Sequence, residues 1–193
     1  MIDVVGFIEL GGFYTSFMSG NTTQLGASLM AFGPQVFLAA GLIAMFLGGS
    51  FLGSLVSSIG HRQGRIGVLA IVILGMLVSV LLYASGFTPA QAMLALAAAA
   101  GAQNAVLPQT GAARLGATFV TGTLFAAGQD MARAVRGEAP PLRWVQHIFV
   151  WASLLLGAAI GALAYHHWHI AALAVPGAIY LAFMAGYIIR SPR

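Results

Sequence analysis

Apolar segments long enough to cross a lipid bilayer fill most of this 193-residue chain, and only 6% of its residues are charged. A soluble domain carries about 25% charged residues, which help to cover its surface. The composition, 60% hydrophobic, therefore predicts an all-α integral membrane protein with a single domain over residues 1–193. Because the chain has no cysteine, disulfides, thiol chemistry and cysteine-ligated metals are excluded.

Turns and polar loops divide the chain into about six transmembrane segments. Two of these segments are predicted to be discontinuous: the first (1–13, resuming at 22–31) and the fourth (90–102, resuming at 122–135). The other four are expected to be continuous, over 35–59, 66–84, 144–165 and 170–189. Thr88 followed by Pro89 is typical of a capped helix start and fixes the beginning of the fourth segment.

Arginine positions predict the orientation of the segments. With six crossings, three arginine-containing regions fall on one side of the membrane, which the positive-inside rule makes cytoplasmic, together with the C-terminus. The arginines are too scattered for a nucleic-acid surface, so nucleic acid is not an expected partner. The three regions contain Arg62 and Arg65; Arg133, Arg136 and Arg143; and Arg190 and Arg193.

One short phrase occurs twice, once in each discontinuous segment. Phe17-Met18-Ser19-Gly20-Asn21 returns as Phe119-Val120-Thr121-Gly122-Thr123. With three crossings in each half, the second copy enters the membrane from the side opposite to the first. We therefore expect an inverted 3+3 repeat, with repeat one over about 1–86 and repeat two over about 87–193.

A polar break in a membrane helix leaves backbone groups that must face protein or a water-filled cavity. Ser19, Asn21, Thr121 and Thr123 are expected to cap the half-helices that follow the breaks, whose N-termini attract anions or carbonyl oxygens. The alternative is that these residues only satisfy a kinked backbone. The predicted solute-binding residues are Ser19, Gly20, Asn21, Thr22, Gln103, Asn104, Arg114, Thr121, Gly122 and Thr123.

Charged residues inside the apolar segments are functional candidates because burying a charge in a bilayer is costly. Asp3, Glu9 and Asp130 are predicted to couple proton movement or to pair with a positive charge, and Arg114 is the expected partner of Asp3 or Glu9. The alternative for Asp3 and Asp130 is a position near the membrane surface. Neither a catalytic set nor a cofactor motif is visible, so no enzyme activity and no cofactor are expected.

Two other patterns have mainly structural interpretations. The motifs Gly49-xxx-Gly53 and Gly157-xxx-Gly161 are expected to let helices pack closely within the chain, with a dimer contact as the alternative. A histidine cluster at 166–169 has no carboxylate or cysteine beside it, and we therefore expect no metal site there.

Four stretches of the sequence resemble the two signatures of a known family. They are Asp3-Val4-Val5-Gly6-Phe7, Met18-Ser19-Gly20-Asn21-Thr22, Gly101-Ala102-Gln103-Asn104-Ala105 and Thr118-Phe119-Val120-Thr121-Gly122-Thr123-Leu124. The family is the YoaK-like family of uncharacterised bacterial inner-membrane proteins. This resemblance implies a six-helix protein of the bacterial inner membrane and leaves the substrate open.

The sequence thus predicts a small membrane transporter, or a pore, for a small polar or anionic solute bound between two half-helix N-termini. The alternative is a non-transporting accessory or scaffolding subunit of a larger membrane complex. Expected partners are the lipid bilayer and the solute, and also a second copy of the chain or a larger membrane complex.

Overall fold

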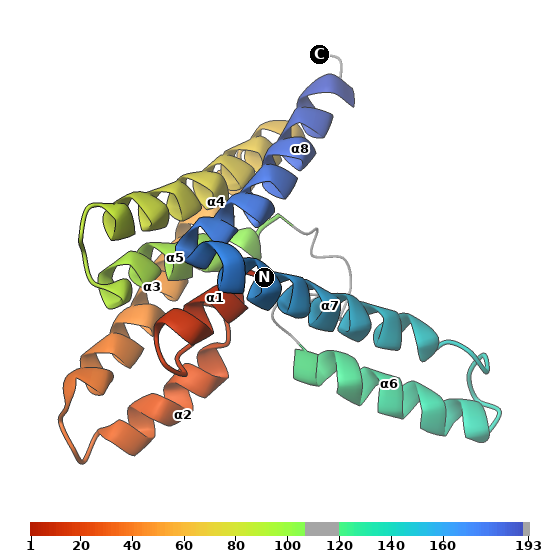
Figure 1. Ribbon diagram of the computed structural model, residues 1–193. Helices are drawn as coiled ribbons and strands as arrows, with labels where there is room; N and C mark the ends of the chain where they lie inside the picture. Colours follow the sequence, from red (N-terminus) through yellow and green to blue (C-terminus); the bar gives the residue numbers. More distant parts are fainter. Residues whose placement is uncertain (107–119, 191–193) are drawn as a thin grey trace.

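The computed structural model describes residues 1–106 and 120–190, and within these ranges the chain forms helices and no strand (Figure 1). The predicted all-helical class is therefore confirmed for the described residues. In chain order the elements are α1 (Ile2–Glu9), α2 (Met18–Ser28), α3 (Pro34–Ser57), α4 (His61–Ala84), α5 (Pro89–Gln103), α6 (Val120–Val135), α7 (Val145–Trp168), the 3₁₀ helix η1 (His169–Leu173) and α8 (Ala174–Arg190).

Three stretches among the described residues are long and apolar enough to cross a membrane. They are Pro34–Ser57, His61–Ala84 and Val145–Ile189, of which the last contains α7, η1 and nearly all of α8. Large apolar side chains on these helices, such as Phe37, Leu47 and Phe183, are exposed on the protein surface. This pattern suits contact with lipid, and the chain is a multi-pass membrane protein.

Several helix boundaries differ from the sequence prediction. Arg62 and Arg65 were expected in a loop, but α4 already begins at His61, because the turn from α3 takes only residues 58–60. Gly60 in this turn has a φ of +152°, which L side chains rarely adopt. His166 and His167 belong to the end of α7 rather than to a connection. By contrast, the predicted start of α5 is confirmed.

The cap of α5 is a capping box, in which Thr88 and Gln91 exchange hydrogen bonds.

Helix α5 packs against both α3 and α4, and small residues allow the closest approach. A Cβ atom added at Gly49 would collide with the carbonyl oxygen of Ala98, and one at Gly53 would lie 2.8 Å from the Cα of Ala102. Gly161 of α7 approaches α1 in the same way, with Met1 Cα 2.8 Å from the added atom. The predicted packing of small residues within the chain is confirmed at these three glycines.

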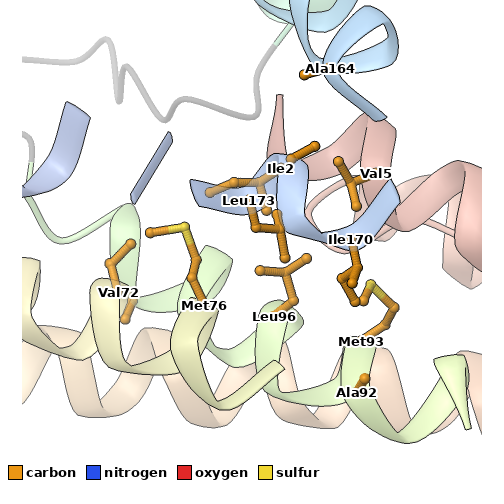
Figure 2. Close-up of a cluster of buried hydrophobic side chains, with 12 residues drawn as sticks. Ile2, Val5, Val72, Met76, Ala92, Met93, Leu96, Ala164, Ile170 and Leu173 are labelled. Carbon is orange, nitrogen blue, oxygen red and sulfur yellow. The ribbon is translucent and has the colours of Figure 1, made fainter. Parts of the chain in front are cut away.

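A cluster of buried apolar side chains joins the two halves of the chain (Figure 2). Val5 of α1 lies there with Met93 and Leu96 of α5, and with Ile170 and Leu173 of η1. These contacts hold the short helix α1 against α5 and η1 of the second half. They therefore fix the position of the chain that leaves α1, which contains the candidate site.

The beginning of α4 lies beside the end of α8. Arg62 donates a hydrogen bond from Nη2 to the carbonyl oxygen of Ile188 at 3.1 Å, and Arg65 donates from Nη1 to the hydroxyl of Tyr187 at 3.0 Å. The Arg65 guanidinium also lies 5.4 Å from the centre of the Tyr187 ring. The first arginine region and the C-terminal end of α8 therefore share one end of the molecule, as the charge pattern predicts.

Candidate functional site

The chain between α1 and α2 reverses direction over residues 10–17. Gly11 and Gly12 have φ values of +61° and +113°, which L side chains rarely adopt, so this turn depends on the pair of glycines. The carbonyl oxygen of Gly12 accepts a hydrogen bond from the side-chain amide of Gln24 in α2 at 2.5 Å. The reversal thus folds residues 13–17 back between α1 and α2.

Asp3 anchors this reversal from α1. Its Oδ1 accepts hydrogen bonds from the hydroxyl of Thr15 at 3.1 Å and from the backbone N–H of Ser16 at 2.7 Å. Thr15 is fully buried. Asp3 therefore has a defined structural task in addition to the charge-coupling role predicted for it.

Asn21 anchors the same reversal from α2. Its Nδ2 donates to the carbonyl oxygen of Tyr14 at 2.6 Å, and its Oδ1 accepts from the N–H of Tyr14 at 2.9 Å. The side chain is fully buried. In this conformation Asn21 shapes the wall of the site through Tyr14 instead of presenting its amide to a solute.

Helix α2 begins earlier than expected, at Met18. The prediction that Ser19 and Asn21 cap it is wrong, because Phe17 occupies the cap position and makes no side-chain capping bond. The N–H of Met18 donates to Ser16 and that of Asn21 donates to Phe17. Within the described part of the chain, this leaves the N–H groups of Ser19 and Gly20 without an acceptor.

The two copies of the repeated phrase line one cavity of about 260 Å³. The first copy contributes Phe17, Met18 and Ser19, and the second contributes Thr121 and Gly122 from the first turn of α6. Ser16 and Phe46 complete the described lining. The N-terminal turns of α2 and α6 therefore face a common space, although they lie about a hundred residues apart in the chain.

A second cavity, of about 460 Å³, adjoins the first. Ser16 and Phe17 line both cavities, so they form a shared wall. Asp3 and Gln103 are among its polar residues, and apolar side chains of α1, α7 and α8 form most of the rest. The predicted site residue Gln103 thus contributes to this space from the end of α5.

The remaining predicted solute contacts among the described residues, Gly20 and Asn21 included, do not line either cavity. Asn104 donates from Nδ2 to the carbonyl oxygen of Ala100 at 3.2 Å, and its buried Oδ1 has no partner among the described residues. Thr22 donates its hydroxyl to Met18 within its own helix at 2.8 Å. Thr123 lies in the first turn of α6. Arg114 lies outside the described residues.

The other charged candidates lie apart from the cavities. Glu9 accepts a hydrogen bond from the hydroxyl of Tyr165 on α7 at 3.0 Å. Asp130 is buried between α6 and α7, with Arg143 Nε and His147 Nε2 each 3.3 Å from its Oδ2. Arg133 Nη1 lies 4.0 Å from its Oδ1. No group of His, Asp and Glu suited to a metal ion occurs among the described residues.

Sequence reasoning missed the residues that shape the reversal. Tyr14, Thr15 and Ser16 were treated as part of a break, yet each is held by a hydrogen bond from α1 or α2. Three polar residues directly after Gly11-Gly12-Phe13 are the signal that could have identified them. Tyr180, which lines the larger cavity, carries no such signal because it sits within an apolar helix.

Comparison with known proteins places the chain in a family but gives it no named relative. Neither the curated proteins nor the solved structures contain a match to this chain. One family model, described as protein of unknown function (DUF1275), matches residues 1–186 and thus nearly the whole chain. This is the YoaK-like family that the sequence motifs indicated, and the chain therefore belongs to the DUF1275 family.

Proposed function

We propose that this protein is a small membrane transporter, or a pore of similar build, for a small polar or anionic solute. The observation that carries the proposal is the common cavity lined by Met18 and Ser19 of α2 and by Thr121 and Gly122 of α6. In transporters built from repeats, the substrate site characteristically lies between discontinuous helices of the two halves.

The chemistry of the smaller cavity favours a ligand that accepts hydrogen bonds. The N–H groups of Ser19 and Gly20 have no acceptor in the described part of the chain. Aligned peptide dipoles add a positive partial charge at the start of α2, worth about 0.3–1 kcal/mol toward an anion. Ser19 of α2 and Thr121 of α6, which both carry hydroxyl groups, also line this cavity.

The helix order supports an inverted repeat as the frame of this transporter. In the first half, two helices of 8 and 11 residues (α1 and α2) precede two of 24 (α3 and α4). In the second half, two helices of 15 and 16 residues (α5 and α6) precede one of 24 (α7), which η1 joins to α8. We assign repeat one to about 1–86 and repeat two to about 87–193. Movement of α6 and α7 against the closely packed helices α3, α4 and α5 then exposes the cavity to each side in turn.

We place the protein in the bacterial inner membrane with its C-terminus in the cytoplasm, on the basis of the arginine pattern and the family motifs. Asp3, Glu9 and Asp130 are the residues we propose for proton coupling or charge pairing. Arg114 is assigned to the balance of anionic charge, from its place in the sequence alone.

Flux into liposomes tests the proposal. Purified protein is reconstituted and offered inorganic phosphate, 4-methylpentanoate and leucine, with and without a pH gradient. Gly122→Leu fills the smaller cavity and is expected to reduce flux at least about tenfold. The matched control is Gly128→Leu, since Gly128 is exposed on the same helix and an added Cβ meets nothing within 4 Å.

Two outcomes would contradict the proposal. Equal flux through the Gly122→Leu and Gly128→Leu proteins would remove the solute path from this cavity. A wild-type protein that moves none of the solutes under either gradient would favour the non-transporting alternative, an accessory subunit of a larger membrane complex.

A further inference from the structure

Resting on the proposed function, we infer that the larger cavity receives an apolar, ammonium-bearing part of the solute, with Asp3 as its counter-ion. The solute is then a zwitterion with an apolar side chain, of the amino-acid class. Its anionic group occupies the smaller cavity and its remainder occupies the larger one. The proposed function assigns only a polar or anionic solute. The present inference adds a positively charged group and an apolar part to that solute.

Asp3 is the carboxylate that lines the larger cavity. Both hydrogen bonds to its carboxylate, from Thr15 and from Ser16, end on Oδ1. The other oxygen, Oδ2, receives no hydrogen bond within the described ranges. The α-ammonium of Met1, which lines the same cavity, interacts electrostatically with Asp3, but no cation of the described ranges lies within ion-pair distance of it. Asp3 is half-buried and lines the larger cavity.

A carboxylate in this position is costly without compensation. Charged side chains in membrane segments characteristically pair with one another or face a cavity that a substrate or ion enters. The two donors on Oδ1 orient the group, but neither carries a positive charge. A solute ammonium at Oδ2 supplies the charge and the missing donor in one group.

The walls of the larger cavity suit the apolar part of such a solute. Leu154, Ile179 and Phe183 contribute apolar surface from α7 and α8. The volume of about 460 Å³ falls within the range of about 300–1,000 Å³ that is typical of small-molecule sites. An inorganic ion would leave most of this apolar surface without a contact.

The two cavities are adjacent, as a single solute requires. Ser16 lines both, and its backbone N–H binds Asp3. The unpaired N–H groups of Ser19 and Gly20 follow within four residues. The carboxylate of Asp3 is therefore bound at one end of the short segment 16–20, and the N–H groups that could bind a solute carboxylate lie at its other end.

Three solutes that share a branched apolar chain and differ in their charged groups separate the contributions of the ammonium and the carboxylate. Leucine has both charges, 4-methylpentanoate lacks the ammonium, and 3-methylbutylamine lacks the carboxylate. In liposomes that contain the wild-type protein, we expect leucine to be preferred over each of the other two by at least about tenfold, since a desolvated charge pair is lost in each comparison.

The variant Asp3→Asn keeps a carbonyl oxygen that accepts from Thr15 and Ser16 while removing the charge. It should abolish the preference for leucine over 4-methylpentanoate. Thr15→Val is the matched control, because it deletes one of the same hydrogen bonds at a buried position and leaves the charge intact. Its preference for leucine should match that of the wild type.

The outcomes separate this inference from the proposed function. If the wild-type protein moves phosphate or 4-methylpentanoate as well as leucine, the ammonium site is wrong and the transporter proposal stands. If Asp3→Asn and Thr15→Val lose the preference equally, Asp3 acts only on the structure of the reversal and the inference fails. If no solute moves, both proposals are overturned.

Discussion

The α3–α5 and α6–α7 interfaces hold pairs of helices together by opposite means. Where α3 meets α5, glycine and alanine backbones touch, as at Gly49 and Ala98. Where α6 meets α7, one buried carboxylate of Asp130 lies among Arg143, His147 and Arg133. The first interface relies on close van der Waals packing, and the second relies on a few charged groups.

This difference bears on which part of the protein moves. Tightly packed backbones have one arrangement, because small displacements lose many contacts at once. An interface centred on one carboxylate can open by breaking a few bonds, and its arginines are about half exposed. We expect α3, α4 and α5 to form a fixed frame against which α6 and α7 move (Figure 1).

The largest effect is expected at the close-packed interface. Gly49→Ala places a methyl group against the backbone of Ala98 and should destabilise the protein by about 1–3 kcal/mol or more. Thermal unfolding in detergent measures this loss.

Gly48→Ala is the control, because Gly48 is exposed and nothing lies within 4 Å of an added Cβ. Alanine also has the better helix propensity, so this variant should unfold at the wild-type temperature or slightly above it. Equal destabilisation at both positions would show that α3 does not approach α5 in this way.

A smaller and more local effect is expected at the charged interface. Asp130→Asn removes the negative charge that Arg143 and His147 share, at a cost of about 1–2 kcal/mol. Amide hydrogen exchange should quicken in α6 and at the start of α7 and stay unchanged in α3.

Glu138→Gln is the matched control, since the ion pair of Glu138 with Arg136 at 2.8 Å is exposed. Such pairs contribute little to stability, and exchange should stay at wild-type rates. Faster exchange throughout the chain after Asp130→Asn would contradict the division into a frame and a movable pair.

The smallest effect is expected at the contact of α7 with α1, outside both interfaces. Tyr165→Phe removes one hydrogen bond, from α7 to Glu9 of α1, and should cost about 0.5–1.5 kcal/mol. Unfolding temperature and flux should both change little. A loss of flux as large as that of Gly122→Leu would place Glu9 and Tyr165 in the transport mechanism itself.

Much of the helical framework could be predicted because membrane helices have a simple sequence pattern. The apolar runs and the Thr88-Pro89 start located the long helices, and the family motifs pointed to the DUF1275 family. Boundaries failed where one residue decides the geometry. Gly60 lets α4 begin before Arg62 and Arg65, and composition alone does not reveal that turn.

The site could be predicted only in outline. The repeated phrase indicated which turns would face each other, and Ser19 and Thr121 do line one cavity. The function of individual side chains depended on contacts between residues distant in the chain. The amide of Asn21 is fully used by its bonds to Tyr14, and one oxygen of Asp3 binds the segment after Gly12, which no local pattern shows.

The central claim is that the first turns of α2 and α6 share one cavity. Since the chain contains no cysteine, Ser19→Cys and Thr121→Cys are unique labels for a bulky, charged thiol reagent. Each single variant should react from water, whereas Leu47→Cys, on an exposed apolar face of α3, should be protected by lipid.

The decisive measurement is the labelling stoichiometry of the Ser19→Cys, Thr121→Cys double variant. A cavity of about 260 Å³ holds one bulky adduct, so we predict one label per molecule, with the first reaction blocking the second. Two labels per molecule, attached at the rates of the single variants, would contradict the shared cavity and the transport path built on it.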